Sequence, residues 1–247
     1  MTNTVKIAVL LFVFVSICSA STAVIIVDDD RILIGADSKL QYSLAGTGAM
    51  CKINTEFKNC TFVVTGIAAD RALGFDAERY ANHACNAKAT FAEIIQSFAA
   101  EAEPTLANVL LYKKLYEPKI YEIYLGRRNS PFAVAFAGFE KGKPIAVTVE
   151  FMLDEKGTLS KTFRSAPVDG NLFTLGVGDA AFQFVSDIIG KPTTIFEDRP
   201  ALILKLIEIE IAADPDDVGP PISILEIREQ SHRWLEDGLC ICSFALS

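Results

Sequence analysis

The sequence has little of what metal, cofactor and nucleic-acid sites require. It contains only two histidines, His83 and His232, in 247 residues, and its cysteines do not have zinc-site spacing. The net charge is −8, and basic residues occur singly or in pairs, whereas phosphate binding needs a concentrated basic face. Low-complexity tracts and internal repeats are also missing from the sequence. We therefore expect no metal ion, no cofactor and no nucleic-acid partner.

Long hydrophobic runs are scarce as well, and the main one stands at the N-terminus. Lys6 precedes an apolar run over residues 7–17, and residues 18–20 (CSA) form a small-x-small cleavage pattern. This order is typical of a secretory signal peptide. A membrane anchor is the alternative, because residues 7–27 contain no charge. Small and polar residues interrupt that span at positions 16–22, so the sequence favours a signal peptide.

Removal of a leader at 1–20 would leave residues 21–247, which we interpret as a single globular domain. The chain is 51% hydrophobic and 22% charged, as in folded domains. The expected location is secreted or periplasmic, with no membrane contact after removal of the leader. Five cysteines then remain, an odd number at irregular spacing: Cys51, Cys60, Cys85, Cys240 and Cys242. Export permits disulfides, and a Cys51–Cys60 bridge across a short loop is one open alternative.

Strand and helix patterns alternate in blocks along the mature chain. Strand patterns occupy 22–27 and 31–37, joined by Asp28-Asp29-Asp30, and then 49–54 and 60–66. Helical periodicity follows from Ala68 and again over 91–117, where Thr90 is the expected N-cap and Pro104 an expected interruption. Further strands are predicted at 131–140, 144–153, 159–166 and 172–178, helices at 179–190 and 199–213, and a strand at 222–227. Segregated strands and helices predict an α+β fold with sheets packed on each other.

The first strands carry the residue types of an acyl-transfer site. A cut within residues 20–22 would expose Ser21 or Thr22, whose hydroxyl is the nucleophile and whose α-amine, with an ordinary pKa of about 7.7–8.0, is the base. Lys52 would stabilise the alkoxide electrostatically, and Asp37 would hold Lys52 in place. The backbone N–H of Gly66, expected at a strand-to-helix junction, would bind the oxyanion.

Three segments also resemble a known family. "TAVIIVDDDRILIGADSK", "MCKIN" and "FVVTGIAADRA" are similar, in order and approximate spacing, to the opening of proteasome β-type subunits in the N-terminal nucleophile (Ntn) hydrolase superfamily. The resemblance implies a four-layer αββα sandwich of two antiparallel sheets. It assigns Asp37 as the supporting aspartate, Lys52 as the catalytic lysine and Gly66 as the oxyanion-hole glycine. Counting back from Asp37 without a gap places Ser21 at the nucleophile position, while Thr22 is the residue type that the family uses more often, so both stay open.

The resemblance implies an exported hydrolase that cleaves a peptide or small amide, through an acyl-enzyme. A non-catalytic binding or assembly protein on the same fold is the alternative, because Val177 and Val218 replace the serines that assist the amine in that family. Simpler explanations exist for each residue: Lys52 as a surface residue of an edge strand, Asp37 and Gly66 as turn residues. The acidic run at 214–217 is interpreted as a solvated turn, with a supporting catalytic role as the alternative. Composition does not decide whether the chain forms a homo-oligomer.

Overall fold

The computed structural model describes residues 17–19, 21–42, 46–55, 60–126, 130–168, 171–176, 178–189, 195–238 and 240. The proposed leader lies outside these residues except for a short strand, β1 (Ile17–Ser19). The other strands are β2 (Thr22–Val27), β3 (Ile32–Asp37), β4 (Lys39–Tyr42), β5 (Gly46–Ala49), β6 (Ile53–Asn54), β7 (Thr61–Asp70), β8 (Phe75–Asp76), β9 (Phe132–Glu140), β10 (Lys143–Leu153), β11 (Leu159–Ala166), β12 (Leu172–Gly176), β13 (Ile222–Arg228) and β14 (Ser231–Glu236). The helices are α1 (Ala77–Ala87), α2 (Phe91–Tyr116), α3 (Pro118–Gly126), α4 (Asp179–Ile188) and α5 (Arg199–Ala213), with a 3-10 turn at Arg71–Leu73.

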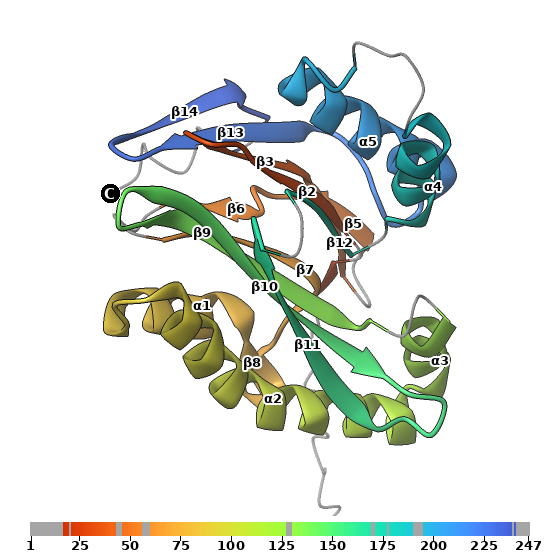
Figure 1. The fold of residues 1–247 in the computed structure, drawn as a ribbon. Coiled ribbons are helices and arrows are strands. Elements are labelled where there is room, and N and C mark those ends of the chain that lie inside the picture. The colour runs from red at the N-terminus through yellow and green to blue at the C-terminus, as the bar shows by residue number, and fades with distance from the viewer. Residues whose placement is uncertain are drawn as a thin grey trace, which may run out of the picture.

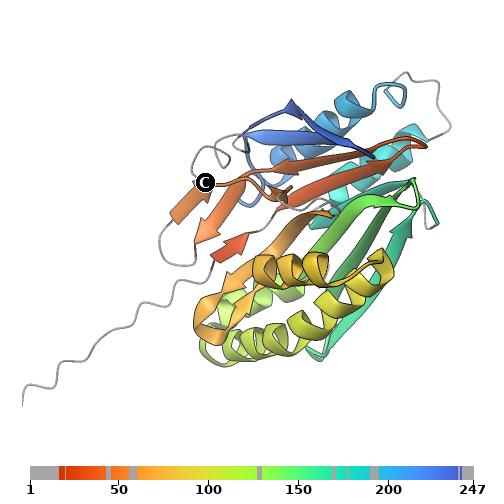
Figure 2. The ribbon, with the colours of Figure 1, turned by 90° about the vertical axis from the view of Figure 1, so that its left-hand side faces the viewer.

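Two antiparallel sheets pack face to face, and helices cover the outer face of each (Figure 1). Within the described residues, the smaller sheet has the order β12-β2-β3-β13-β14. The larger has the order β11-β10-β9-β7-β1-β4-β5, with β6 and β8 also paired to β7. Helices α1 and α2 lie against the larger sheet, and α4 and α5 against the smaller one, as the side view in Figure 2 also shows. The predicted four-layer αββα sandwich of the α+β class is therefore confirmed.

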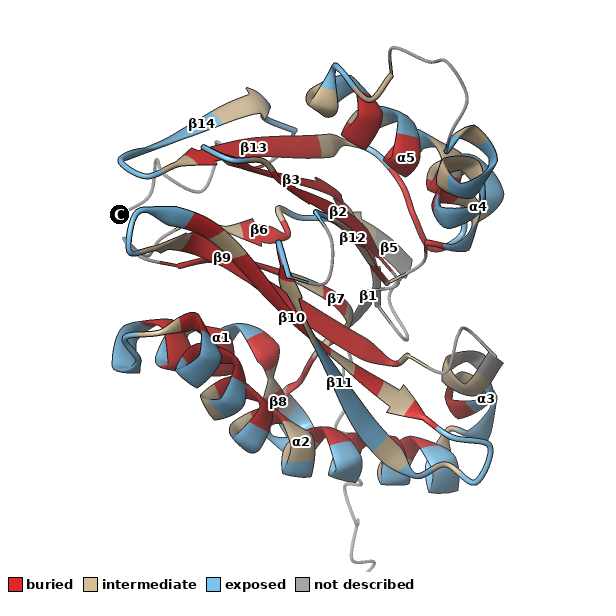
Figure 3. Ribbon diagram, viewed as in Figure 1, coloured by how far each residue is buried: buried red, intermediate tan, exposed pale blue. Residues whose placement is uncertain are grey.

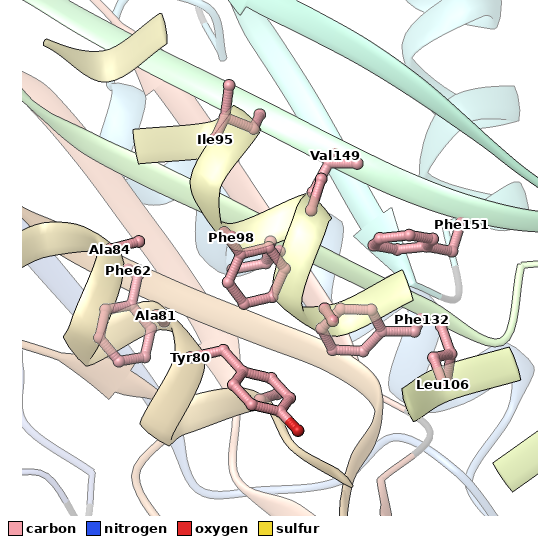
Figure 4. Close-up of a cluster of buried hydrophobic side chains, with 14 of the residues drawn as sticks. Phe62, Tyr80, Ala81, Ala84, Ile95, Phe98, Leu106, Phe132, Val149 and Phe151 are labelled. Atoms are coloured by element: carbon pink, nitrogen blue, oxygen red, sulfur yellow. The ribbon is translucent and has the colours of Figure 1, made fainter. Parts of the chain in front are cut away.

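Strand β9 contributes side chains to two hydrophobic cores, one between the larger sheet and its helices and one between the two sheets. Because side chains alternate across a strand, Phe132, Val134 and Phe136 face the helices, while the intervening alanines face the other sheet. Phe132 stacks on Phe98 of α2, with 5.9 Å between ring centroids (Figure 4). Large residues thus fill the helix-facing layer, and small ones let the two sheets approach each other.

Strands β2 and β3 lie at the centre of the sandwich, which is why their sequences are hydrophobic without alternation. Every residue of both strands is buried (Figure 3). Gly35 on β3 lets α5 approach closely, because a Cβ at this position would lie 2.1 Å from Ile203 Cγ2. Covered by α5 on one face and by the larger sheet on the other, the β2–β3 hairpin provides a rigid support for the residues at its end.

Most of the predicted elements are confirmed, and the errors have identifiable causes. The β2–β3 hairpin, β9 to β13, α4 and α5 occur close to their predicted bounds. Helix α2 begins after a Thr90–Glu93 capping box as expected, but it continues through Pro104, which the prediction took as an interruption. The predicted helix from Ala68 is wrong at its start, because β7 extends to Asp70 and α1 begins only at Ala77.

The cysteines pair across distant parts of the chain. Cys51 is bonded to Cys240, and Cys60 to Cys85, so the Cys51–Cys60 bridge is wrong. The partners are 189 and 25 residues apart, so their proximity depends on the tertiary fold and is not visible in their spacing. Cys242 lies outside the described residues.

A buried carboxylate supports the outer end of the smaller sheet. Glu226 of β13 is 4% exposed and lies within 3.2 Å of Arg31, Arg228 and Arg233. Burial alone would raise the pKa of Glu226, but hydrogen bonds from Arg228 and Arg31 prevail and lower its pKa. Ionised Glu226 therefore stabilises the fold. No helix in the described part of the chain is long and apolar enough to cross a membrane.

Candidate active site

The centre of the candidate site is a buried carboxylate at the end of β3. The antiparallel register of β2 and β3 pairs Ala23 with Ala36 and so brings the start of β2 to Asp37. The backbone N–H of Thr22 donates to Asp37 Oδ1 at 2.9 Å. The second oxygen, Oδ2, accepts from the backbone N–H groups of Lys39 at 3.1 Å and Gly219 at 3.2 Å. The bond from Lys39, two residues on, is the local backbone contact expected of a turn residue, but the fully buried side chain also binds Thr22 and Gly219 from distant segments.

Lys52 completes this hydrogen-bonded group. Its Nζ donates to Asp37 Oδ1 at 2.8 Å, and its side chain is only 4% exposed. It is therefore not a surface residue of an edge strand, and it is not in a strand at all, because it precedes the two-residue strand β6. Burial removes water from the charged ammonium of Lys52, and the carboxylate of Asp37 compensates for that loss.

The two buried charges alter each other's ionisation. Burial lowers the pKa of Lys52, and the charge and hydrogen bond of Asp37 act against this shift. Burial raises the pKa of Asp37, opposed first by Lys52 and then by the N–H groups of Thr22 and Gly219. A lysine whose pKa is lowered is better able to give up and take back a proton than a solvated one.

Ser21 lies directly before this group and is 1% exposed. Its carbonyl oxygen packs so closely on Gly176 that a Cβ there would lie 1.9 Å from it. Gly176 adopts a φ of +75° and pairs with Thr22 through the β12–β2 ladder. Within the part of the chain that the structure describes, the hydroxyl of Ser21 is buried and has no hydrogen-bond partner.

Gly66 lies inside β7, not at the strand-to-helix junction that the sequence suggested. Its φ is +84°, and a Cβ would lie 2.2 Å from the carbonyl oxygen of Pro131, so no other residue fits here without strain. Thr65, the preceding residue, is also among the neighbours of Gly176 and therefore lies on the Ser21 side of β7. Gly66 thus belongs to the same region of the fold as Ser21.

Strand β1 brings the end of the proposed leader to the same place. It is paired antiparallel to β7 on one side and to β4 on the other, with Ser19 opposite Gly66 (Figure 2). Residues 17–19 are therefore an internal strand of the larger sheet, two residues before Ser21. This strand was not predicted, because residues 17–19 were interpreted as the end of a leader.

The loop after α5 supplies further contacts. Besides the Gly219 bond to Asp37, the N–H of Ser38 donates to the carbonyl of Gly219 at 3.2 Å. Asp217 in the same loop is 1% exposed, so the interpretation of residues 214–217 as a fully solvated turn is wrong for this residue. Val218 is buried as well, whereas Val177 lies outside the described residues.

Comparisons with known proteins leave the family of this chain open. No protein-family model and no curated protein matches it. Among solved structures it is similar to a Gly-1 mutant of Anbu from Hyphomicrobium sp. strain MC1, with 13% sequence identity, a TM-score of 0.49 and coverage of 87% of each chain. At this level the function must be argued from the residues of the site.

The structure brings together four of the five residues predicted from the sequence and places the fifth nearby. Asp37 is hydrogen-bonded to Lys52 and Thr22, and Ser21 adjoins them. Gly66 lies on β7 of the larger sheet. Sequence reasoning missed Gly219 and the role of Gly176; a glycine before a late strand and a glycine at the end of a strand were the only signals. Among the described residues, no group of three His, Cys, Asp or Glu side chains is arranged to hold a metal ion.

Proposed function

We propose that this protein is an exported Ntn hydrolase that cleaves peptide bonds, with Ser21 as its N-terminal nucleophile. The observation that carries the proposal is the buried Lys52–Asp37 pair, whose Asp37 also binds the backbone N–H of Thr22. A buried ion pair is costly to desolvate and contributes little net stability, so a functional reason for keeping it is favoured. Here the pair lies directly beside the residue that removal of a leader would expose.

The hydrogen bond of Thr22 favours Ser21 over Thr22 as the first residue. If the chain began at Thr22, its α-amine would lie 2.9 Å from the Asp37 carboxylate, which would stabilise the ammonium form and make the amine a poor base. If the chain begins at Ser21, the N–H of Thr22 is an ordinary amide donor to Asp37. The buried hydroxyl of Ser21 is then available, since no described residue binds it.

The reaction follows from these groups. The α-amine of Ser21 takes the hydroxyl proton while Oγ attacks the carbonyl carbon of the substrate, and the ammonium of Lys52 stabilises the negative charge on Oγ. The N–H of Gly66 binds the resulting oxyanion. Collapse breaks the C–N bond, the amine returns the proton to the leaving nitrogen, and an ester remains on Ser21. Water, deprotonated by the same amine, then hydrolyses the ester and releases the acid.

Strand β1 supports an extended peptide as the substrate class. Its pairing with β7 ends at Ser19 opposite Gly66 and its pairing with β4 at Cys18 opposite Gln41, so the chain enters the site as a β-strand. After the leader is removed, the edges of β7 and β4 would be free to pair with another extended segment in the same register. A segment bound in the register that Ser19 has with Gly66 would present a backbone carbonyl to Ser21. A small amide would leave both edges unpaired.

Two features support export. The two disulfides are typical of an oxidising compartment, and the N-terminal pattern is typical of a signal peptide. Ser21 and Thr22 are buried, so a separate peptidase must cut before the chain folds, as a signal peptidase acting during translocation does. A cut made by the folded protein itself is the alternative, and the Ser21→Ala variant separates the two.

The test combines the mass of the mature chain with labelling by a β-lactone probe. Secreted wild type should begin at Ser21 and gain one acyl group. Ser21→Ala should abolish labelling, whereas Thr22→Val, which keeps the N–H to Asp37, should retain it. Cleavage of Ser21→Ala at the same bond assigns the cut to a separate peptidase, and an uncut variant assigns it to the protein itself.

A mature chain that begins elsewhere would overturn the proposed nucleophile. A chain that begins at Ser21 but takes up no probe would favour the non-catalytic binding or assembly protein. If Thr22→Val alone lost labelling, the nucleophile would be Thr22.

A further inference from the structure

The residue before Lys52 is covalently bound to a distant part of the chain. Cys51 forms a disulfide with Cys240, with an S–S distance of 2.03 Å and a Cα–Cα distance of 4.8 Å. The covalent attachment is therefore one residue away from the lysine whose Nζ binds Asp37.

The segment that carries Lys52 has few other restraints. It lies between β5 and β6 outside any strand, and β6 contains only Ile53 and Asn54, paired to β7. The N–H of Met50 donates to the carbonyl of Ser38 at 2.8 Å. Backbone hydrogen bonding at Met50 and at β6, where Ile53 is also buried in the core, thus flanks Lys52, and the disulfide at Cys51 is the covalent restraint on this segment.

The other end of the disulfide lies close to Asp37. The Sγ of Cys240 is buried and 3.2 Å from the hydroxyl of Ser223 on β13. In the β13–β3 ladder, Ser223 pairs with Ala36, and its neighbour Ile222 pairs with Asp37. The disulfide therefore ties the Lys52 segment to a residue beyond β14 that contacts β13, and β13 is the strand that pairs with Asp37.

The second disulfide has a different place and different exposure. Cys60 and Cys85 join the start of β7 to α1 in the helix-facing layer, and both are buried. Cys51 is only half-buried, so a thiol from solvent reaches the Cys51–Cys240 bond more readily. The protein thus contains one disulfide at the ion pair and one remote from it, and the latter serves as a matched control.

We propose that the Cys51–Cys240 disulfide positions Lys52 against Asp37, so that the site is assembled only when this bond is oxidised. In its formation, the thiols of Cys51 and Cys240 lose two protons and two electrons to an external disulfide, such as that of a thiol–disulfide oxidoreductase, which is reduced to two thiols. Cys51 and Cys240 are positioning residues and do not contact the substrate. The inference rests on the proposed function only for its effect on catalysis, since the effect on Lys52 can be measured separately.

The test compares Cys51→Ala/Cys240→Ala with Cys60→Ala/Cys85→Ala, both secreted and processed. Hydrogen exchange at residues 50–55 should accelerate in the first variant and remain at the wild-type rate in the second. The β-lactone labelling rate should fall about 100-fold in the first, because small displacements at an active site have effects of this size. It should change less than about threefold in the second, since that bond is remote from the site. The pH dependence of labelling should shift only in the first variant, because displaced Lys52 no longer sits beside Asp37.

Stepwise reduction of the wild type provides a second route if the first variant does not fold. Limited dithiothreitol should open Cys51–Cys240 first, lower the labelling rate, and allow recovery on reoxidation by oxidised glutathione. Unchanged exchange at 50–55 after loss of the bond would overturn the proposal. If exchange accelerates but even wild type is not labelled, the positioning of Lys52 stands and the proposed hydrolase activity fails.

Discussion

The strongest single prediction concerns the free energy that links Lys52 to Asp37. Both side chains are almost fully buried, and their nearest atoms are 2.8 Å apart. Removing one partner of a buried ion pair typically costs about 3–5 kcal/mol, because the other charge is left without compensation. Lys52→Met leaves Asp37 with three backbone N–H donors, so we expect the lower end, about 3 kcal/mol. Asp37→Asn removes the carboxylate to which the buried Nζ of Lys52 donates, so we expect a loss of about 4 kcal/mol in unfolding free energy.

The double variant isolates the pair itself. If the two substitutions acted independently, Asp37→Asn/Lys52→Met would lose about 7 kcal/mol of unfolding free energy, the sum of the two single losses. With no buried charge remaining, we expect the double variant to lose only about 4 kcal/mol, which corresponds to a coupling energy of about 3 kcal/mol. Free energies of unfolding come from urea denaturation at pH 7 with the disulfides intact. Lys39→Met is a matched control, because the Nζ of Lys39 donates to the backbone carbonyl of Pro215 at an exposed position. The substitution keeps the backbone N–H of residue 39, which donates to Asp37. We expect it to cost under about 1 kcal/mol. A coupling below about 1 kcal/mol, or equal losses for Lys39→Met and Lys52→Met, would refute the buried ion pair.

Three further predictions test other parts of the structure. The pKa of Glu226 is lowered in the folded state, so its contribution to stability is present above pH 4.5, the ordinary glutamate pKa, and is lost as the pH falls through the folded pKa. Thermal denaturation from pH 7 to 3 should therefore show that Glu226→Gln is less stable than wild type by an amount that shrinks toward pH 3. A stability difference that stays constant over this range would contradict the lowered pKa. Gly66→Ala should lose at least about 1–2 kcal/mol from its positive φ alone, with the Pro131 contact adding to it, and should lose probe labelling; a variant of wild-type stability would show that the backbone here is not constrained. Glu210→Gln weakens the buried bond from the N–H of Ala181 at the start of α4, and urea denaturation should show a loss of about 1–2 kcal/mol, whereas no loss would mean that the bond is not charge-assisted.

Local patterns predicted much of the fold. The hydrophobic runs of β2 and β3 with an acidic turn between them, and the Thr90 capping box of α2, are encoded by adjacent residues and occur as expected. Prediction failed where distant contacts override local preference. Helix α2 passes through Pro104 because its apolar face is held against the larger sheet. Strand β7 continues through a stretch of helical periodicity because β1 and β8 pair with it there.

The residue types of the candidate site were also present in the sequence, but their relationships were not. The resemblance named Ser21 or Thr22, Asp37, Lys52 and Gly66 as candidates from their order and approximate spacing. Whether Lys52 was buried or exposed could not be decided from a lysine between hydrophobic residues. The N–H of Gly219, from a loop 182 residues away from Asp37, could not be found at all.

The sequence by itself therefore determined the layer architecture and the chemical groups at the start of the proposed mature chain, because periodicity and residue type are local properties. Only the tertiary structure decided that Lys52 pairs with Asp37, which cysteines are bonded, and that residues 17–19 pair with the strand of Gly66. Those relationships depend on sheet register and on the packing of the two sheets, which bring together segments as far apart as Cys51 and Cys240.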